Sequence, residues 1–207
     1  MKYQISPNKF DVGDVLALSD DITIDNDVTS TELTDRMAVL GADLLVTTLS
    51  DLPNKLNSCE PQLMSEGSRA PKITIDDCGV SFEDLTDEEV WNKFRAFGHV
   101  TKYQLKATFE GQLVKFVEFK NPKVESFSGD CSSPPGSVVY LKKDKSLAIK
   151  CKRGWIKCTK LKMNRPITAT DFKNAQIVRR KKMGQKIIVF EPFRDSIDKN
   201  KLFKVKQ

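Results

Sequence analysis

Basic side chains concentrate in two short stretches of the second half of the sequence, and their chemistry points to phosphate. The first stretch covers two predicted hairpin turns and contains Lys142, Lys143, Lys145, Lys150, Lys152, Arg153 and Lys157. The second is the run Arg179-Arg180-Lys181-Lys182. Crowding like charges together costs electrostatic energy unless an anion approaches them. Both stretches are therefore candidate contacts for the backbone of a nucleic acid.

Two aromatic residues, Tyr140 and Trp155, accompany the first stretch, and their rings could stack on unpaired bases. The alternative is a solvated, charged surface with Trp155 in the core, and for any single lysine this alternative stays open. The charge of the whole second half favours a nucleic acid. Residues 1–100 hold 8 Lys and Arg against 19 Asp and Glu, a net charge of −11, whereas residues 101–207 hold 26 against 9, a net charge of +17. Each phosphate that a basic residue neutralises releases counterions and so contributes affinity.

The acidic first half offers less chemistry. Its aspartates miss the calcium-loop pattern because no glycine follows Asp25-Asn26-Asp27 at the required position, and turns and helix starts explain them. Asp11 precedes Gly13 on a predicted tight turn, which alone is weak evidence of catalysis. His99 is expected in a linker. Five cysteines without CxxC spacing indicate reduced structural thiols and no metal site: Cys59, Cys78, Cys131, Cys151 and Cys158.

The elements of the first half are read from helix start and stop signals. Residues 10–24 predict a loop followed by extended structure. Thr29 and Glu32 form a capping box ahead of apolar residues at helical spacing, which predicts an amphipathic helix that ends near Pro53. A second capping box, Thr86 to Glu89, predicts a short helix that Gly98 terminates in the left-handed conformation.

From Lys102 the apolar residues alternate, which predicts short strands. Glu110-Gly111 is a predicted tight turn between the first two, and basic turns separate the next three. At least five strands in succession favour a small barrel of the OB type, with a brief helical turn at 171–175 and a late strand at 187–190. No apolar run is long enough to cross a bilayer, and no basic amphipathic helix suggests a membrane surface.

Several segments follow one another in the order seen in a known family: KFDVGDVLALSDDITI, TSTELTDRMAVLGADLLVTTL, RAPKIT, KFRAFG, PGSVVY and ITATDFKN. From Lys9 to Asn174 the chain resembles the methionyl-tRNA formyltransferases, especially their mitochondrial branch. One departure is the sequence after Arg95-Ala96-Phe97, where bacterial members carry Asn-Pro-Trp-Pro and this chain continues Gly98-His99-Val100. The tail after Asn174 has no firm counterpart.

The resemblance implies a Rossmann-like domain that binds 10-formyltetrahydrofolate and an OB-like barrel that helps to hold methionyl initiator tRNA. In that reaction the α-amino group of the aminoacyl-tRNA attacks the formyl carbon, and an Asn, a His and an Asp form the catalytic set. Asp11 matches the Asp, and Phe10, Asp11 and Gly13 match the loop on the folate side. No residue of this sequence corresponds to the catalytic Asn or to the catalytic His. The chain alone is therefore expected to be inactive.

The expected fold is α+β, with a remnant of the Rossmann-like catalytic domain at 1–76, a linker and short helix at 77–101, and a basic OB-like tRNA-binding domain at 102–207. The expected protein is a monomer of the mitochondrial matrix that uses 10-formyltetrahydrofolate as co-substrate and no metal, with initiator methionyl-tRNA as partner and no membrane. Two alternatives stay open: a non-catalytic RNA-binding fragment, and another folate-dependent formyl-transferring or formyl-hydrolysing enzyme.

Overall fold

The structure, a computed structural model of the 207-residue chain, describes residues 13–62, 70–184 and 187–193. The chain divides into two units, Met1–Lys72 and Ile73–Gln207. The second unit therefore begins ahead of residues 77–101, the stretch that the sequence pattern predicts as a linker with a short helix.

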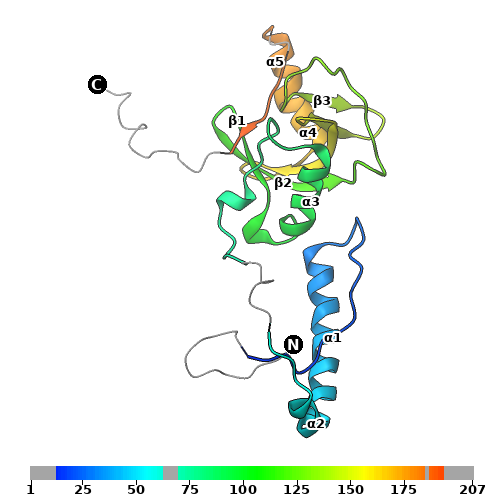
Figure 1. Cartoon of the computed structure of the whole chain (residues 1–207). Helices are drawn as coiled ribbons and strands as arrows, with labels where there is room; N and C mark the ends of the chain where they lie inside the picture. The colour runs from blue at the N-terminus through cyan, green and yellow to red at the C-terminus, as the bar shows by residue number, and fades with distance from the viewer. Residues whose placement is uncertain (1–12, 63–69, 185–186, 194–207) are drawn as a thin grey trace, which may run out of the picture. The chain divides into compact units, whose positions relative to one another are not determined.

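The first unit is helical in its described part (Figure 1). It contains α1 (Ser30–Ser50) and α2 (Leu52–Asn57). The predicted capping box of α1 is confirmed, because the Glu32 amide donates to Thr29 Oγ1 at 3.3 Å and the Thr29 amide donates to Glu32 Oε2 at 2.8 Å. The extended structure predicted for residues 15–24 is reduced to one bridge, in which Val15 pairs with Glu60.

The apolar stripe of α1 is largely uncovered within the described residues. Met37 is 45% exposed and Leu40 is 42% exposed, and no apolar side chain in the described part of this unit is buried. The capping box and backbone hydrogen bonds thus define this helix, whereas side-chain packing defines the second unit.

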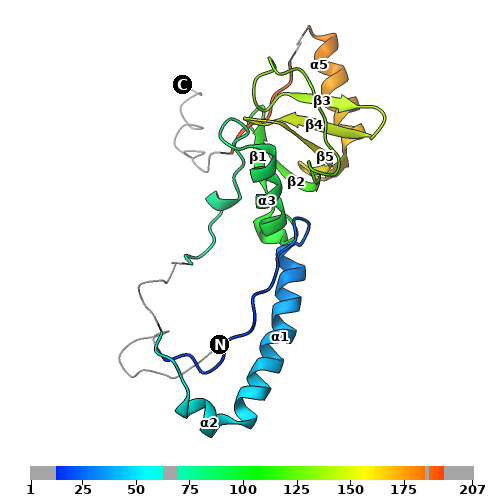
Figure 2. The same cartoon turned by 45° about the vertical axis from the view of Figure 1, so that its right-hand side comes forward.

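The second unit is built on an antiparallel sheet (Figures 1 and 2). Its strands are β1 (Lys106–Phe109), β2 (Gln112–Lys120), β3 (Val138–Leu141), β4 (Ser146–Lys150), β5 (Trp155–Lys162), β6 (Pro166–Thr168) and β7 (Glu191–Pro192). Burial does not alternate in every strand, since the first four residues of β4 and of β5 are all buried. The order is β3-β4-β5-β2-β1-β7, with β6 beside β5. The Glu110-Gly111 turn is confirmed, since φ is positive at both residues, 49° and 74°, as a tight turn between twisted strands requires.

One segment near the end of the described chain contacts both edges of this sheet. The Val138 amide, at the start of β3, donates to the Ile188 carbonyl at 2.8 Å, and the Phe190 amide donates to the Gly136 carbonyl at 2.9 Å. Immediately afterwards β7 pairs with β1. The predicted strand at 187–190 is present only as a bridge between Ser137 and Val189. The sheet is therefore curled, which fits an OB-like barrel.

The core of the unit draws on its first residues as well as on its strands. Phe82, Val90 and Phe94 are buried with Phe116 and Phe190 in one apolar cluster. Val90 and Phe94 belong to α3 (Asp87–Phe97), which begins at the predicted capping box of Thr86 and Glu89. Short helical turns stand on either side of α3: η2 (Asp76–Cys78) and η3 (Thr101–Tyr103). Residues 77–101 therefore pack into the barrel unit.

The predicted left-handed conformation of Gly98 is wrong, since its φ is −61° and its ψ is −28°. The position has a different requirement. A Cβ atom at Gly98 would lie 2.3 Å from the Phe94 ring, so the glycine lets the end of α3 close tightly over a buried aromatic side chain.

The helical turn predicted near residue 171 is longer than expected. It comprises α4 (Ala169–Phe172), the π-helical turn η4 (Lys173–Ile177) and α5 (Val178–Lys182). Thr168 and Asp171 form a capping box at its start, which the sequence analysis missed. Ala169, Phe172 and Ile177 are buried, which fixes this helical segment to the sheet.

Candidate functional site

The turn between β3 and β4 presents free basic side chains. Lys142, Lys143 and Lys145 are exposed, and Lys145 adopts a φ of +49° that tightens the hairpin. Within the described residues none of these three lysines forms an ion pair, although the charge of Lys143 contributes to lowering the pKa of Asp144 in the same turn. Their exposure lets them meet an incoming anion.

The turn between β4 and β5 has a different electrostatic setting. Lys152 and Arg153 are exposed, but the Arg153 carbonyl accepts a hydrogen bond from the Asp87 amide at 3.1 Å. The pKa of Glu89 is lowered chiefly by hydrogen bonds from Thr86, with a smaller contribution from the charges of Lys152 and Arg153. The acidic start of α3 thus offsets part of the positive charge of this turn.

These two turns stand at opposite ends of β4, a strand of five residues. At a rise of about 3.3 Å per residue the strand separates them by roughly 16 Å. The seven basic residues that are close in sequence are therefore not one patch in space.

Lys157 is turned into the protein. Its side chain is 8% exposed and its ammonium lies 2.5 Å from an Asp144 carboxylate oxygen. The hydrogen bond from Lys157 is the main cause that holds the pKa of Asp144 below its ordinary value, and the positive charge of Lys157 adds to it. A paired ammonium at this depth is a structural element, so Lys157 is removed from the set of candidate phosphate contacts.

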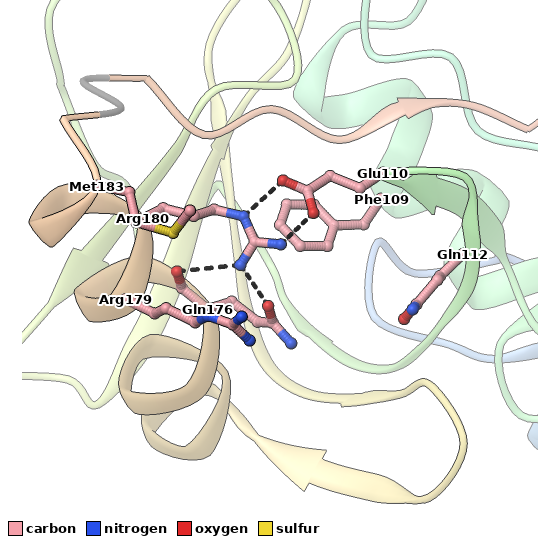
Figure 3. A pocket seen from close by; sticks show the side chains of 7 residues that line it. All are labelled: Phe109, Glu110, Gln112, Gln176, Arg179, Arg180 and Met183. Atoms are coloured by element: carbon pink, nitrogen blue, oxygen red, sulfur yellow. Dashed lines mark hydrogen bonds and ion pairs between the residues drawn. The ribbon is translucent and has the colours of Figure 1, made fainter.

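The run on α5 also divides into exposed and paired residues. Arg179, Lys181 and Lys182 are exposed. The Arg180 side chain is only 13% exposed, and Figure 3 shows its guanidinium between two partners. Its Nε donates to Glu110 Oε1 at 2.6 Å, and it also donates to the Gln176 carbonyl at 3.2 Å.

A contact with an aromatic ring adds to the setting of Arg180. The guanidinium carbon lies 4.7 Å from the centre of the Phe109 ring, a cation–π distance. Its hydrogen bonds and charge lower the pKa of Glu110. Arg180 therefore ties α5 to the β1–β2 turn, and its three exposed neighbours are left to face solvent.

The prediction of base stacking fails for Trp155 and stays a prediction for Tyr140. Trp155 is 4% exposed and packs edge to face on Phe127, so stacking on a base is wrong for Trp155 and the alternative of a core residue is confirmed. Lys150 approaches its ring, with Nζ 5.7 Å from the ring centre. Tyr140 is half-buried, and its hydroxyl lies 3.0 Å from Thr170 Oγ1.

The sequence analysis missed one basic residue of this surface. Lys173, in the π-helical turn, places its Nζ 5.6 Å from the centre of the Tyr140 ring. Tyr140 lies two residues before Lys142, so Lys173 joins the basic β3–β4 turn to the helical segment. A single lysine between Phe172 and Asn174 carries no sequence signal for this contact, which arises from the tertiary fold.

Other site chemistry is sparse in the described ranges. Within them, no group of three or more His, Cys, Asp or Glu residues could hold a metal ion. No helix there is both long and apolar enough to cross a membrane. Burial raises the pKa of the Cys151 thiol to about 12, so this cysteine is a poor nucleophile.

Comparison with known proteins assigns the fold to a family. Residues 72–176 match the family model described as formyl transferase, C-terminal domain. The chain belongs to this family. The expected resemblance to methionyl-tRNA formyltransferases is confirmed. The matched residues lie almost entirely within the second unit and include the β3–β4 turn, but they end at Gln176, before α5.

Curated relatives share the resemblance over most of this chain but not over most of their own length. The chain is 30% identical over 182 residues to "Methionyl-tRNA formyltransferase, mitochondrial" of Homo sapiens, which covers 84% of this chain and 45% of that protein. The corresponding protein of Rattus norvegicus is 33% identical over 180 residues, covering 84% and 46%. The bacterial methionyl-tRNA formyltransferase of Finegoldia magna is 28% identical, covering 79% and 50%. The chain thus spans about half the length of these relatives.

One solved structure is similar in fold. HypX from Aquifex aeolicus aligns with a TM-score of 0.55 over 83% of this chain and 30% of that chain, at 15% identity. At this identity the likeness concerns the fold alone.

The folate-side loop expected from the resemblance is only partly described. Phe10 and Asp11 lie outside the described residues. Gly13 is half-buried at the start of the described part, two residues before the bridge of Val15 with Glu60. The catalytic assignment of Asp11 therefore stays a prediction.

Proposed function

We propose that this chain serves the formylation of initiator methionyl-tRNA and that its second unit grips the RNA backbone. The observation that carries the proposal is an exposed basic surface. It comprises Lys142, Lys143 and Lys145 of the β3–β4 turn, inside the residues that match the formyl transferase C-terminal domain, and Arg179, Lys181 and Lys182 of α5, directly after them. These side chains lie on a +17 half of the chain, and phosphates are the matching charges. Lys152, Arg153 and Lys150 are assigned a smaller share of the contacts.

Filter binding of methionyl-tRNA to the 207-residue chain over a range of salt concentrations tests the grip. Affinity should fall steeply with salt, and reversing Lys142, Lys143 and Lys145 to Glu should reduce the slope by about one unit per lost contact. Lys72→Glu, at an exposed lysine of the first unit, is the control. A salt-independent affinity would favour another folate-dependent formyl-transferring or formyl-hydrolysing enzyme over a tRNA enzyme.

The first unit is proposed as part of the Rossmann-like catalytic domain that binds 10-formyltetrahydrofolate, and the second as an OB-like barrel. Asp11 is proposed to orient and stabilise the catalytic His as that residue takes a proton from the attacking amine. Phe10 and Gly13 are proposed to shape the folate-side loop. The family resemblance carries these assignments.

A chimera of this chain behind the N-terminal half of the rat relative tests the reaction. It should formylate methionyl-tRNA with 10-formyltetrahydrofolate, and Asp11→Asn should lower turnover by about 10² to 10⁴ with little change in tRNA affinity. Asp14→Asn provides a nearby control of the same chemical change. Near-normal turnover of Asp11→Asn would remove Asp11 from the catalytic set.

A mitochondrial location is proposed because the relatives from mammals are named as mitochondrial proteins. Cell fractionation of the full protein tests it, and recovery outside mitochondria would contradict it.

A further inference from the structure

A groove lies between β3 and the helical segment α4–η4–α5. Its lining includes Val139, Tyr140, Lys173, Ile177, Lys181 and Ile187. Val139 is 41% exposed and Ile187 is 52% exposed, so apolar surface is open to solvent inside a strongly basic unit. None of the described residues that line the groove is acidic.

The π-helical turn explains why two lysines lie along this one groove. The Val178 amide donates to the Lys173 carbonyl, five residues back, so the turn contains one residue more than an α-helical turn. Two α-helical turns hold about 7.2 residues, and the additional residue raises this to about 8. Lys173 and Lys181 are eight residues apart, and the π turn therefore brings both residues to the same side of the helical segment, where both line the groove.

Tyr140 forms a fixed wall of the groove. Its hydroxyl is held by Thr170 at 3.0 Å, and its ring carries the Lys173 ammonium at 5.6 Å from the ring centre. A ring held at both points loses little conformational freedom when a ligand binds beside it. The groove thus combines a preformed aromatic wall, exposed aliphatic side chains and two cations.

We propose that this groove binds an unpaired nucleotide of RNA, with the base against Val139 and Ile187 and the flanking phosphates against Lys173 and Lys181. The proposal rests on the proposed function and adds to it a subsite that recognises a base outside a duplex. In a duplex the base faces are stacked away, so exposed aliphatic side chains gain contact only from a base that is splayed out. The basic rim without carboxylates fits a polyanionic strand.

Fluorescence anisotropy with a short single-stranded RNA and the 207-residue chain tests this proposal. The double variant Val139→Ser with Ile187→Ser should lower affinity for the single strand by about five- to ten-fold, as expected for loss of base contacts, and leave the salt slope unchanged. The double variant Lys173→Gln with Lys181→Gln should instead reduce the slope by about 1.4, since each phosphate contact on a single strand contributes about 0.7. Val124→Ser, at a valine that is 73% exposed outside the groove, should change neither quantity.

Photo-crosslinking on the unaltered chain provides a second measurement that does not depend on the folding of variants. A single strand that carries 4-thiouridine should crosslink at Val139 or Tyr140, and a duplex with the same label should not. Three outcomes would overturn the proposal: an abasic strand binds as tightly as the intact strand, polyglutamate competes as well as RNA does, or the crosslinks form outside the groove. If methionyl-tRNA still binds with a steep salt slope while the groove variants behave as wild type, this inference alone fails. If the chain ignores methionyl-tRNA, the proposed function fails with it.

Discussion

The Lys157 ammonium on β5 contacts the Asp144 carboxylate in the β3–β4 turn at 2.5 Å, while the neighbouring Lys142 and Lys143 stay exposed. This relationship separates structural charge from binding charge within one run of basic residues. A buried cation whose partner is removed keeps its desolvation penalty and loses its attraction.

Asp144→Asn should therefore lower the melting temperature by about 5 °C at neutral pH. Lys157→Met should cost less, because it replaces the buried cation with an apolar side chain of similar length and leaves Asp144 partly solvated. Thermal unfolding followed by circular dichroism measures both, with Lys143→Met as an exposed control. Equal melting temperatures for Asp144→Asn and wild type would contradict the structural role of the pair.

The two hairpin turns should differ in their share of tRNA binding. Lys142→Gln with Lys143→Gln should reduce the salt slope of methionyl-tRNA binding by about two units. Lys152→Gln with Arg153→Gln should reduce it by less than one unit, because Asp87 and Glu89 stand beside that turn. Each double variant removes two positive charges, so it controls for the other, and equal slopes would show that the acidic start of α3 has no effect.

Gly136 and Gly111 should respond differently to alanine although both have positive φ, 81° and 74°. A Cβ at Gly136 would lie 2.2 Å from the Phe190 carbonyl oxygen, whereas nothing stands within 4 Å of a Cβ at Gly111. Gly111→Ala should cost about 1–2 kcal/mol for the left-handed backbone alone. Gly136→Ala should cost clearly more, because it also pushes apart the contact between β3 and the closing segment. Urea denaturation measures the loss of unfolding free energy in both variants. Similar losses would mean that the contact between β3 and the closing segment accommodates the added methyl group without further strain.

Acid should weaken the tie between α5 and the β1–β2 turn. Hydrogen bonds from Arg180 are the largest cause of a lowered pKa of Glu110. A carboxyl with a lowered folded pKa contributes stability that is complete above its unfolded value, about 4.3, and is lost as the pH falls through the folded pKa. Glu110→Gln should thus lower the melting temperature at pH 7 more than at pH 3. The exposed Glu83→Gln should show no such difference. If the melting temperatures of Glu110→Gln and wild type differed by the same amount at both pH values, the ion pair would not contribute to the stability of the fold.

Local signals in the sequence predicted the local structure well. Period-two alternation located β1 to β5, and the capping boxes at Thr29 and Thr86 located the starts of α1 and α3, because each signal depends on residues within a few positions of one another. The turn at Glu110-Gly111 was predictable for the same reason.

What could not be predicted depends on distant residues. The burial of Lys157 needs Asp144 to reach it from another turn, and the burial of Trp155 needs Phe127. Lys173 gains its place beside Tyr140 from a π-helical turn that has no recognised sequence signature. Counting lysines along the chain therefore identified the basic unit correctly but not which lysines are free.

The closing segment at Ile188–Pro192 has a consequence for how the protein is made. Phe190, which is 2% exposed and touches the rings of Phe116 and Phe172, is synthesised after every strand except β7. Domains generally fold as units, so the sheet can close only after this stretch has been synthesised. A stop codon only slightly upstream would leave a molecule with its basic β3–β4 turn and α5 but an unsealed aromatic interior, a form suited to chaperone capture and degradation.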